Sequence, residues 1–540
     1  MRVAFITLYD NYCLGTRMLV STVLRHGHQA VLITFKRFVN KRFYYNSPAN
    51  MSELRGIMED SGYLPVLEFF GDHDVMCPYP TPIEDIERDL LHARLEDFRP
   101  DMIALSLSSV FVPLARELTL DLRKRFPEAR IMWGGIHCIT DPEDGVGYAD
   151  IICHSEADEC LPALLADPGR REQPGFWFCL DGGVVKNPRA PLPQDLDSLP
   201  WPLHGDAEHE VMIEDGIARF CPVTGYADYT LMTQRGCPFH CTYCLHSQTR
   251  EMWKGQRYLR RRSVDNVLDE VDYVRRRFGF EAVVFADDIF MISEEWIGEF
   301  CRKYRERFPG FPFGAYGHAR FTSQKMLDDL ARTGCWFTAI GIQSGSRYMT
   351  EEVYKRKDDP EQMTHFVGMV RQAGIENIVY DLLTNSSFER EEDCRATLDL
   401  LCRLPKPVKV AIKKIQTYPK SAYAALDLPD GGMSEELFRF YNLLYLLACQ
   451  PGVDGRWVKS LVEDPELRSD TRMLEPLVGA LARTTNRVSE SEERVRHLQH
   501  RLRELETRVP HGVRHAARYL FVQLRKGLAG RLFPSASDRP

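Results

Sequence analysis

The sequence of 540 residues lacks the marks of several protein classes. It has no run of about eighteen apolar residues, so no transmembrane helix is predicted, and its apolar N-terminal run is too short for a secretory signal. Its 15 cysteines are odd in number and scattered, which favours free thiols in a reducing compartment over a disulfide framework. A formal net charge of −8 gives no general attraction for nucleic acid. We therefore expect a cytoplasmic protein without a nucleic-acid partner.

What the chain does contain is typical of a globular protein built from several folding units. Hydrophobic residues make up 44% of it and charged residues 27%, and its length suggests three or four units. Residues 1–187 alternate short β-branched runs with helical patterns, which predicts a doubly wound, Rossmann-like (flavodoxin-like) α/β domain with a parallel sheet. Residues 36–82, rich in aromatics and proline, interrupt this pattern and are interpreted as a lid or cap. Ligands of such sheets bind at the carboxyl ends of the strands.

A second alternation of strands and helices follows a proline-rich stretch. Five prolines between 186 and 206 break helix and strand alike, so residues 188–225 are predicted to be a linker. Six strand and helix units between 226 and 420 predict a partial (β/α)6 barrel, with its chemistry at the carboxyl ends of the strands. Residues 421–485 lose the alternation and are predicted to form a helical C-terminal region.

Residues 486–540 are predicted to form a helical tail with a basic segment. Between 511 and 533 this tail has five Arg or Lys, no acidic residue and one apolar face. Such a segment can lie on an anionic membrane surface, or it can dock on its own protein or on a dimer partner. Peripheral membrane contact and docking on protein therefore both stay open.

The stretch RGCPFHCTYCLHS, after the first barrel strand, carries Cys237, Cys241 and Cys244 and no fourth cysteine nearby. One interpretation is a zinc site with His240 or His246 as the fourth ligand. Zinc sites, however, are usually built from two short pairs on separate turns. Three thiolates within eight residues can instead bind three irons of a [4Fe–4S] cluster and leave the fourth iron open for a reactant.

The spacing CxxxCxxC, with an aromatic residue before the last cysteine, resembles the motif of the radical S-adenosylmethionine (SAM) enzymes. The resemblance implies that SAM binds the open iron and that its cleavage yields a 5′-deoxyadenosyl radical, with an external donor of the flavodoxin or ferredoxin type supplying the electron. It also implies SAM contacts from Tyr243 near adenine, Asp287 or Asp288 at the methionine amino group, and Gln343 and Ser344 at the ribose or carboxylate. For each of these, simple packing or a solvent-facing strand end is the alternative.

The first domain resembles the cobalamin-binding domain that precedes the barrel in one branch of the radical SAM enzymes. Residues 10–15 keep the spacing of the DxHxxG motif, but Tyr12 stands where the histidine would bind cobalt. A phenol is a poor ligand compared with imidazole, so we predict cobalt without a protein imidazole below it. The resemblance implies cobalamin contacts from Tyr12, Leu14, Gly15, Ser106, Ser108, Gly134, Gly135 and Glu156. Taken alone, these glycines and serines would also fit an ordinary Rossmann-like domain.

Together these resemblances imply a cobalamin-dependent radical SAM methyltransferase. Such an enzyme removes hydrogen from an unactivated carbon (or phosphorus) centre of a small-molecule or lipid-like substrate and delivers a methyl group there from methylcobalamin. Two alternatives stay open. One is an enzyme with the same cofactors that forms rings or rearranges its substrate without methyl transfer, and the other is a corrinoid- or metal-binding sensor without turnover.

Overall fold

The computed structural model describes residues 1–8, 13–35, 82–180, 183–205, 207–213, 216–219, 228–356, 358–375, 377–406, 408–418, 420–450, 452–471 and 474. Its two large sheets belong to one compact unit. Apart from Pro82, the predicted insertion at 36–82 lies outside the described residues, and so does the tail at 486–540. The predictions of a lid and of a basic amphipathic helix therefore stay predictions.

The first sheet has nine strands in the order β7-β6-β5-β4-β3-β1-β2-β8-β9. Its strands are β1 (Arg2–Leu8), β2 (Gln29–Phe35), β3 (Met102–Ser106), β4 (Arg130–Gly134), β5 (Ile151–Cys153), β6 (Phe176–Leu180), β7 (Gly183–Lys186), β8 (His209–Ile213) and β9 (Gly216–Arg219). Strand β1 pairs in parallel with both β2 and β3, so the direction of winding reverses beside it. This arrangement confirms the predicted flavodoxin-like domain, and it leaves a crevice at the carboxyl ends of β1 and β3.

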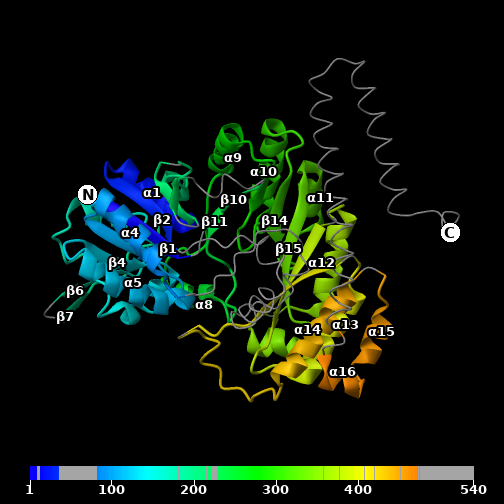
Figure 1. Cartoon of the computed structure of the whole chain (residues 1–540). Helices are drawn as coiled ribbons and strands as arrows, with labels where there is room; N and C mark the ends of the chain where they lie inside the picture. The colour runs from blue at the N-terminus through cyan, green and yellow to red at the C-terminus, as the bar shows by residue number, and fades with distance from the viewer. Residues whose placement is uncertain are drawn as a thin grey trace, which may run out of the picture. The chain divides into compact units, whose positions relative to one another are not determined.

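Helices cover both faces of the first sheet, as the continuous apolar character of its strands requires. Helices α4 (Asp85–Phe98) and α5 (Val112–Arg125) pack on one face in a cluster with Ala4, Ile6 and Leu8. Helices α1 (Leu14–Arg25) and α7 (Cys160–Ala166) pack on the other face with Val3 and Phe5. The alternation of the β1 side chains between the two clusters follows the two-residue period of a strand. In Figure 1 this domain is drawn in blue to cyan.

The prediction of a linker over 188–225 is wrong for residues 209–213 and 216–219. These residues form β8, which pairs in parallel with β2, and β9, which pairs antiparallel with β8. The prolines that suggested a linker end at Pro202, so nothing in HEVMI prevents it from forming a strand. The first sheet therefore extends beyond the predicted boundary at residue 187.

The second sheet consists of six parallel strands in chain order. They are β10 (Asp228–Leu231), β13 (Ala282–Phe285), β14 (Phe313–Gly317), β15 (Cys335–Gln343), β16 (Asn377–Thr384) and β17 (Lys409–Lys414). Among the described residues the first and last of these strands are not paired with each other. The sheet is thus a partial barrel, which confirms the predicted (β/α)6 unit.

The helices between these strands begin and end where the sequence signals them. They are α8 (Leu245–Met252), α9 (Val264–Phe278), α10 (Glu294–Arg307), α11 (Gln324–Thr333), α12 (Pro360–Gln372) and α13 (Glu391–Arg403). The hydroxyls of Ser263, Ser293 and Ser323 accept hydrogen bonds from the first turns of α9, α10 and α11. Gly279 and Gly334, both with positive φ, end α9 and α11. Figure 1 shows α9 to α11 in green along this sheet.

Strand β16 presents different side chains to the two faces of the second sheet. Its residues alternate between buried and half-buried. Thr384, on the buried side, donates a hydrogen bond to Asn442 of α14 (Glu435–Cys449). The register Leu383↔Lys413 places the half-buried Leu383 and the exposed Lys413 on the opposite side. The interior of the partial barrel therefore carries polar as well as apolar side chains.

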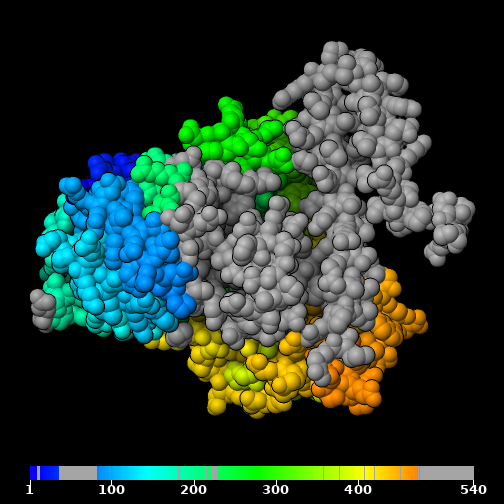
Figure 2. Space-filling model, viewed as in Figure 1, coloured from blue at the N-terminus to red at the C-terminus, as the bar shows by residue number. Residues whose placement is uncertain are grey.

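The C-terminal region that follows the barrel is helical, as predicted, as far as it is described. It contains α14, α15 (Gly455–Leu461) and α16 (Pro465–Ser469), drawn in orange in Figures 1 and 2. Within the described part of the chain, no helix is long and apolar enough to cross a membrane.

Candidate active site between two cofactor cavities

The three cysteines lie on a loop held by a short ribbon that was not predicted. Strand β11 (Gln234–Arg235) pairs antiparallel with β12 (Arg260–Arg261), and the loop runs from β11 to the start of α8. Gly236, between β11 and Cys237, has φ +92°. A Cβ atom there would lie 2.4 Å from the carbonyl oxygen of Tyr258, so only glycine fits this position. The ribbon thereby fixes where the loop begins.

The thiols of this loop are shielded from water. Cys237 and Cys241 are 8% and 5% exposed, and Cys244 is half-buried. Burial raises the pKa of Cys237 to about 12 and that of Cys244 to about 11. Binding a metal must therefore displace protons from these thiols.

The described residues do not arrange a single-ion site around the loop. Among the described residues, no three His, Cys, Asp or Glu side chains converge on one point. A tetrahedral zinc site needs such convergence. A [4Fe–4S] cube does not, because each of its irons takes its own thiolate. The choice of the cluster over zinc therefore rests on the spacing of the three thiolates in the sequence.

A buried arginine, Arg356, holds the cysteine loop through Tyr243. Arg356, 9% exposed, donates hydrogen bonds to the Tyr243 hydroxyl (3.1 Å) and to the carbonyl oxygen of Gly341 on β15 (2.9 Å). It also binds Asp358. The Tyr243 ring lies edge-on to Tyr354, with ring centroids 5.1 Å apart. Tyr243 is thus fixed within the protein and also lines the cavity above the loop.

The two neighbouring aspartates after β13 have different environments. Asp287 is 1% exposed, and its carboxylate accepts hydrogen bonds from the Thr233 and Gln234 amides (2.7 and 3.0 Å) and from the Thr233 hydroxyl. Asp288 is 37% exposed at its side chain, pairs with His246 at 2.8 Å and lines the cavity beside Cys244. Asp287 therefore holds the turn that leads into the cysteine loop. Of the two predicted candidates, Asp288 is the one placed to meet a ligand.

The predicted residues Gln343 and Ser344, at the end of β15, do not line the cavity beside the cysteine loop. Gln343 is 9% exposed, has φ +67° and sits at a register shift of β15 against β16. Ser344 is 2% exposed, lies 3.2 Å from the Thr397 hydroxyl of α13, and accepts a hydrogen bond from the Ser346 amide. Ser344 thus ties β15 to α13, whereas Gln343 occupies a strained bulge position of the kind that often marks functional sites.

A cavity of about 720 Å³ opens above the cysteine loop. From the barrel it is lined by Cys244, His246 and Asp288, and by residues at the ends of β16 and β17. From the first domain it is lined by Ile136 and Glu156. Its volume lies within the range usual for small-molecule sites. We call it the cluster-side cavity.

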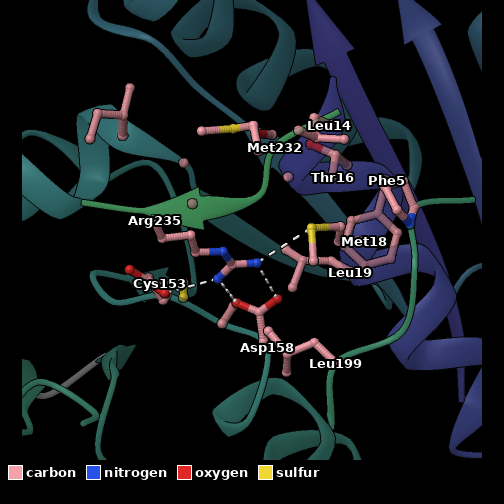
Figure 3. Close-up of a pocket in the computed structure, with 18 of the residues that line it drawn as sticks. Phe5, Leu14, Thr16, Met18, Leu19, Cys153, Asp158, Leu199, Met232 and Arg235 are labelled. Carbon is pink, nitrogen blue, oxygen red and sulfur yellow. Dashed lines mark hydrogen bonds and ion pairs between the residues drawn. The ribbon is translucent and has the colours of Figure 1, made fainter. Parts of the chain in front are cut away.

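A second cavity, of about 310 Å³, lies at the carboxyl ends of β1 and β3, where the winding of the first sheet reverses (Figure 3). We call it the corrinoid-side cavity. Six of the eight residues predicted to bind cobalamin line it: Leu14, Gly15, Ser106, Gly134, Gly135 and Glu156. Ser108 is not in this lining and instead begins a 3₁₀ turn. Tyr12 lies outside the described residues, so the prediction about the lower face of cobalt stays a prediction.

The glycines of this cavity serve different purposes. At Gly135, with φ +86°, a Cβ atom would lie 2.6 Å from the backbone nitrogen of Leu107, so this glycine is needed by the fold itself. At Gly15 a Cβ atom would meet nothing within 4 Å. The fold does not need glycine there, so the bare position leaves room for a ligand to approach the backbone.

Part of the corrinoid-side lining was not predicted from the sequence. It comes from the predicted linker, through Leu196 and the segment 199–202, and from the barrel, through Met232, Arg235 and Arg262. The linker segment DLDSLPWP is similar to that of the cobalamin-binding branch, but its prolines predicted only a connection. Arg235 directly precedes the Gly-Cys pair of the cluster motif, which was the signal available for it.

Comparison with known proteins finds a family match and several similar enzymes. Residues 231–401 match the model of the Radical SAM superfamily. A cytidylyl-2-hydroxyethylphosphonate methyltransferase from Streptomyces wedmorensis is 29% identical over 376 residues, which cover 61% of this chain and 67% of that protein. An anaerobic magnesium-protoporphyrin IX monomethyl ester cyclase from Cereibacter sphaeroides is 26% identical over 345 residues, which cover 61% of this chain and 52% of that protein.

A solved structure has the same fold at low sequence identity. The radical SAM methyltransferase TsrM from Kitasatospora setae aligns with a TM-score of 0.52 and 14% identity, covering 78% of this chain and 75% of that one. The alignment extends well beyond the 171 positions of residues 231–401, so the likeness in fold is not confined to the barrel.

Proposed function

The chain belongs to the cobalamin-binding radical SAM enzymes, and we propose that it methylates an unactivated carbon or phosphorus centre of a small-molecule or lipid-like substrate. Its cofactors are a [4Fe–4S] cluster, SAM and cobalamin. When bound, these groups supply hydrogen abstraction and a transferable methyl group. One observation carries the proposal: the corrinoid-side and cluster-side cavities share five lining residues, Ile136, Ile139, Glu156, Met232 and Arg235. A substrate between them can be reached from both sides.

The proposal assigns a role to each of the main site residues. Cys237, Cys241 and Cys244 hold three irons, and Asp288 accepts hydrogen bonds from the methionine amino group of SAM. The face of the first sheet that carries α1 and α7 holds the corrinoid, with Gly15 and Gly134 allowing close approach. Asp287 and Ser344 act indirectly, because they fix the turn before the cysteine loop and the end of β15.

The substrate lies, in our proposal, against the ends of β16 and β17. There the cluster-side cavity is lined by the apolar Leu383 and Ile415 and by Lys413 and Lys414. Lys413 is 50% exposed and pairs with Asp381 at 3.1 Å, so its ammonium group is held at the cavity wall. Lys414 pairs with Glu435 at 2.9 Å, so carboxylates of the protein already neutralise both ammonium groups and the rest of this wall is apolar. The similar Streptomyces protein is named for a phosphonate substrate.

One observation favours a second function, in which the same cofactors form a ring without methyl transfer. The chain is 26% identical to a protein named as a cyclase, and ring formation would begin with the same hydrogen abstraction.

We also propose that an external flavodoxin or ferredoxin supplies the electron. Contact of segment 511–533 with a membrane surface remains part of the proposal.

A single anaerobic assay separates the alternatives. The reduced, cluster-loaded protein is incubated with SAM, with and without hydroxocobalamin, and S-adenosylhomocysteine and 5′-deoxyadenosine are measured. A methyltransferase forms both products, and S-adenosylhomocysteine only when cobalamin is present. A cyclase forms 5′-deoxyadenosine alone, and formation of neither product contradicts an enzymatic function.

A further inference from the structure

The polar part of the wall between the two cavities is one ion pair. Of the five residues that line both cavities, only Glu156 and Arg235 are charged, and Arg235 Nη1 donates to Glu156 Oε2 at 2.8 Å. Glu156 lies between β5 and α7 of the first sheet, and Arg235 ends β11 of the ribbon. This pair therefore joins the corrinoid-side domain directly to the strand that leads into the cysteine loop.

A second carboxylate, that of Asp158, also binds Arg235. Asp158 accepts two parallel hydrogen bonds from the guanidinium, at 2.7 and 3.0 Å, and its side chain is 5% exposed. Burial raises the pKa of Asp158, but Arg235 lowers it by more, so the carboxylate is ionised. Arg235 Nη2 also lies 3.4 Å from Met18 Sδ of α1. Figure 3 shows the guanidinium between Asp158 and Met18 in the corrinoid-side cavity.

Glu156 also binds the other strand of the ribbon. Arg260 of β12 donates to both of its carboxylate oxygens, at 2.7 and 3.0 Å, and to the carbonyl oxygen of Pro193 at 3.0 Å. One carboxylate thus holds β11 and β12 together. Beyond Arg235 only Gly236, which is fixed against Tyr258, precedes Cys237. A shift of Glu156 or Asp158 would therefore reach Cys237 through Arg235 and Gly236.

We propose that Arg235 is a positioning residue that couples the two cofactor sites. A corrinoid in its cavity contacts Met18, Glu156 and Asp158, and these contacts fix Arg235 and with it the cysteine loop. Because coupling between binding sites is reciprocal, cluster assembly in turn raises the affinity for the corrinoid. This inference rests on the proposed function of the two cavities.

The test measures a coupling, which a merely structural ion pair would not change. The dissociation constant of hydroxocobalamin is measured anaerobically, by its absorption spectrum, for cluster-free and for cluster-loaded protein. We expect cluster loading to tighten binding in the unsubstituted protein by a factor within the about 5–150-fold range usual for coupled sites. In Arg235→Met this factor falls to about one. We expect the EPR spectrum of the reduced cluster to change on addition of hydroxocobalamin in the unsubstituted protein and to stay unchanged in the variant.

Matched variants keep the test independent of folding. Arg257→Met is the control, because Arg257 is exposed and, within the described part of the chain, its side chain binds only the carbonyl oxygen of Gln194. Arg235→Met/Asp158→Asn removes the guanidinium without stranding the ionised Asp158, and it should also lose the coupling. Arg235→Lys keeps the charge but not the two parallel bonds, so it retains part of the factor.

The outcomes separate this inference from the proposed function. If Arg235→Met or the double variant binds both cofactors and keeps the full factor, the inference is overturned. It is also overturned if the unsubstituted protein binds both cofactors without any coupling. If the unsubstituted protein binds no hydroxocobalamin or assembles no cluster, it is the proposed function that fails.

Discussion

The two sheets of this protein place their cavities by different rules. In the first sheet the winding reverses at β1, and the corrinoid-side cavity is lined by the start of α1 and by the carboxyl ends of β3 and β4. In the second sheet all six strands follow chain order, so no such reversal exists and the site lies at the strand ends of the partial barrel. Topology thus indicates where each half can hold a ligand. The two cavities nevertheless share five lining residues, so both halves contribute to each wall.

The strongest test of this comparison is Cys241→Ala. Removing one thiolate from the loop should abolish cluster assembly, with iron and sulfide contents near zero, while hydroxocobalamin still binds to the first domain. The reason is that no residue of the corrinoid-side lining contributes a ligand to the cluster. Iron and sulfide analysis together with the corrinoid absorption spectrum provides the measurement. Unchanged iron and sulfide contents would contradict the cluster assignment.

Gly15→Leu is the converse test in the first domain. A Cβ atom at this position meets nothing within 4 Å, and Gly15 lines the corrinoid-side cavity, so a leucine there should weaken cobalamin binding at least about tenfold. Leucine is also favoured over glycine in a helix by about 1 kcal/mol, so the melting temperature should not fall. Iron content should remain that of the unsubstituted protein. Normal cobalamin affinity in this variant would place the corrinoid elsewhere.

The two aspartates after β13 allow a finer test within the barrel. Asp288→Asn should weaken SAM binding and slow its cleavage about tenfold with little loss of stability, because a half-exposed charge is removed from the cavity. Asp287→Asn should instead lower the free energy of unfolding by about 1–3 kcal/mol, because buried amide donors of Thr233 and Gln234 lose a charged acceptor. Equilibrium SAM binding and denaturant unfolding measure the two effects. The reverse pattern would assign SAM contact to Asp287.

The smallest effect that we predict is a difference in pH dependence between the two halves. Burial lowers the pKa of His154 to about 4 and that of His209 to about 3. The unfolded chain binds these protons more readily, so the first domain should lose stability as the pH falls from about 6.5. Burial, together with Asp393, raises the pKa of Glu389 in the barrel to about 8. The stabilisation that protonated Glu389 gives to the folded state is therefore lost as the pH rises from about 4.5 to 8.

Hydrogen exchange at several pH values distinguishes the two sheets. Protection of β2 and β8 should decline toward acid, and protection of β16 and α13 toward alkali, each by on the order of 1–3 kcal/mol. Glu389→Gln should remove the alkaline decline and leave the acid one unchanged. Parallel behaviour of both sheets at every pH would show that the two halves unfold as one cooperative unit.

Much of the fold could be predicted because its signals are local. The strand and helix alternation, the serine caps of α9 to α11 and the CxxxCxxC spacing are all readable within a few residues. Strand β8 was missed because its parallel partner β2 is distant in the sequence, and β9 pairs only with β8. A short strand after a proline-rich stretch also carries little signal of its own. The ribbon of β11 and β12 is too short for any periodicity.

The same distinction applies to the site. Cys237, Gly15 and Gly134 could be named in advance because a motif carries each of them. Arg235, by contrast, acquires its role from Glu156 and Asp158, which lie 77 to 79 positions away in the sequence. Choosing between Asp287 and Asp288 likewise required knowing which carboxylate the backbone of residues 233 and 234 occupies.

The segment 196–202 has a consequence for engineering. Its leucines, prolines and Trp201 lie between β7 and β8 of the first sheet and at the same time form part of the corrinoid-side lining. A chimera joined within this segment would therefore divide the first sheet and exchange part of a binding surface. A functional recombinant between relatives must inherit this segment with the first domain and with the ribbon that faces it.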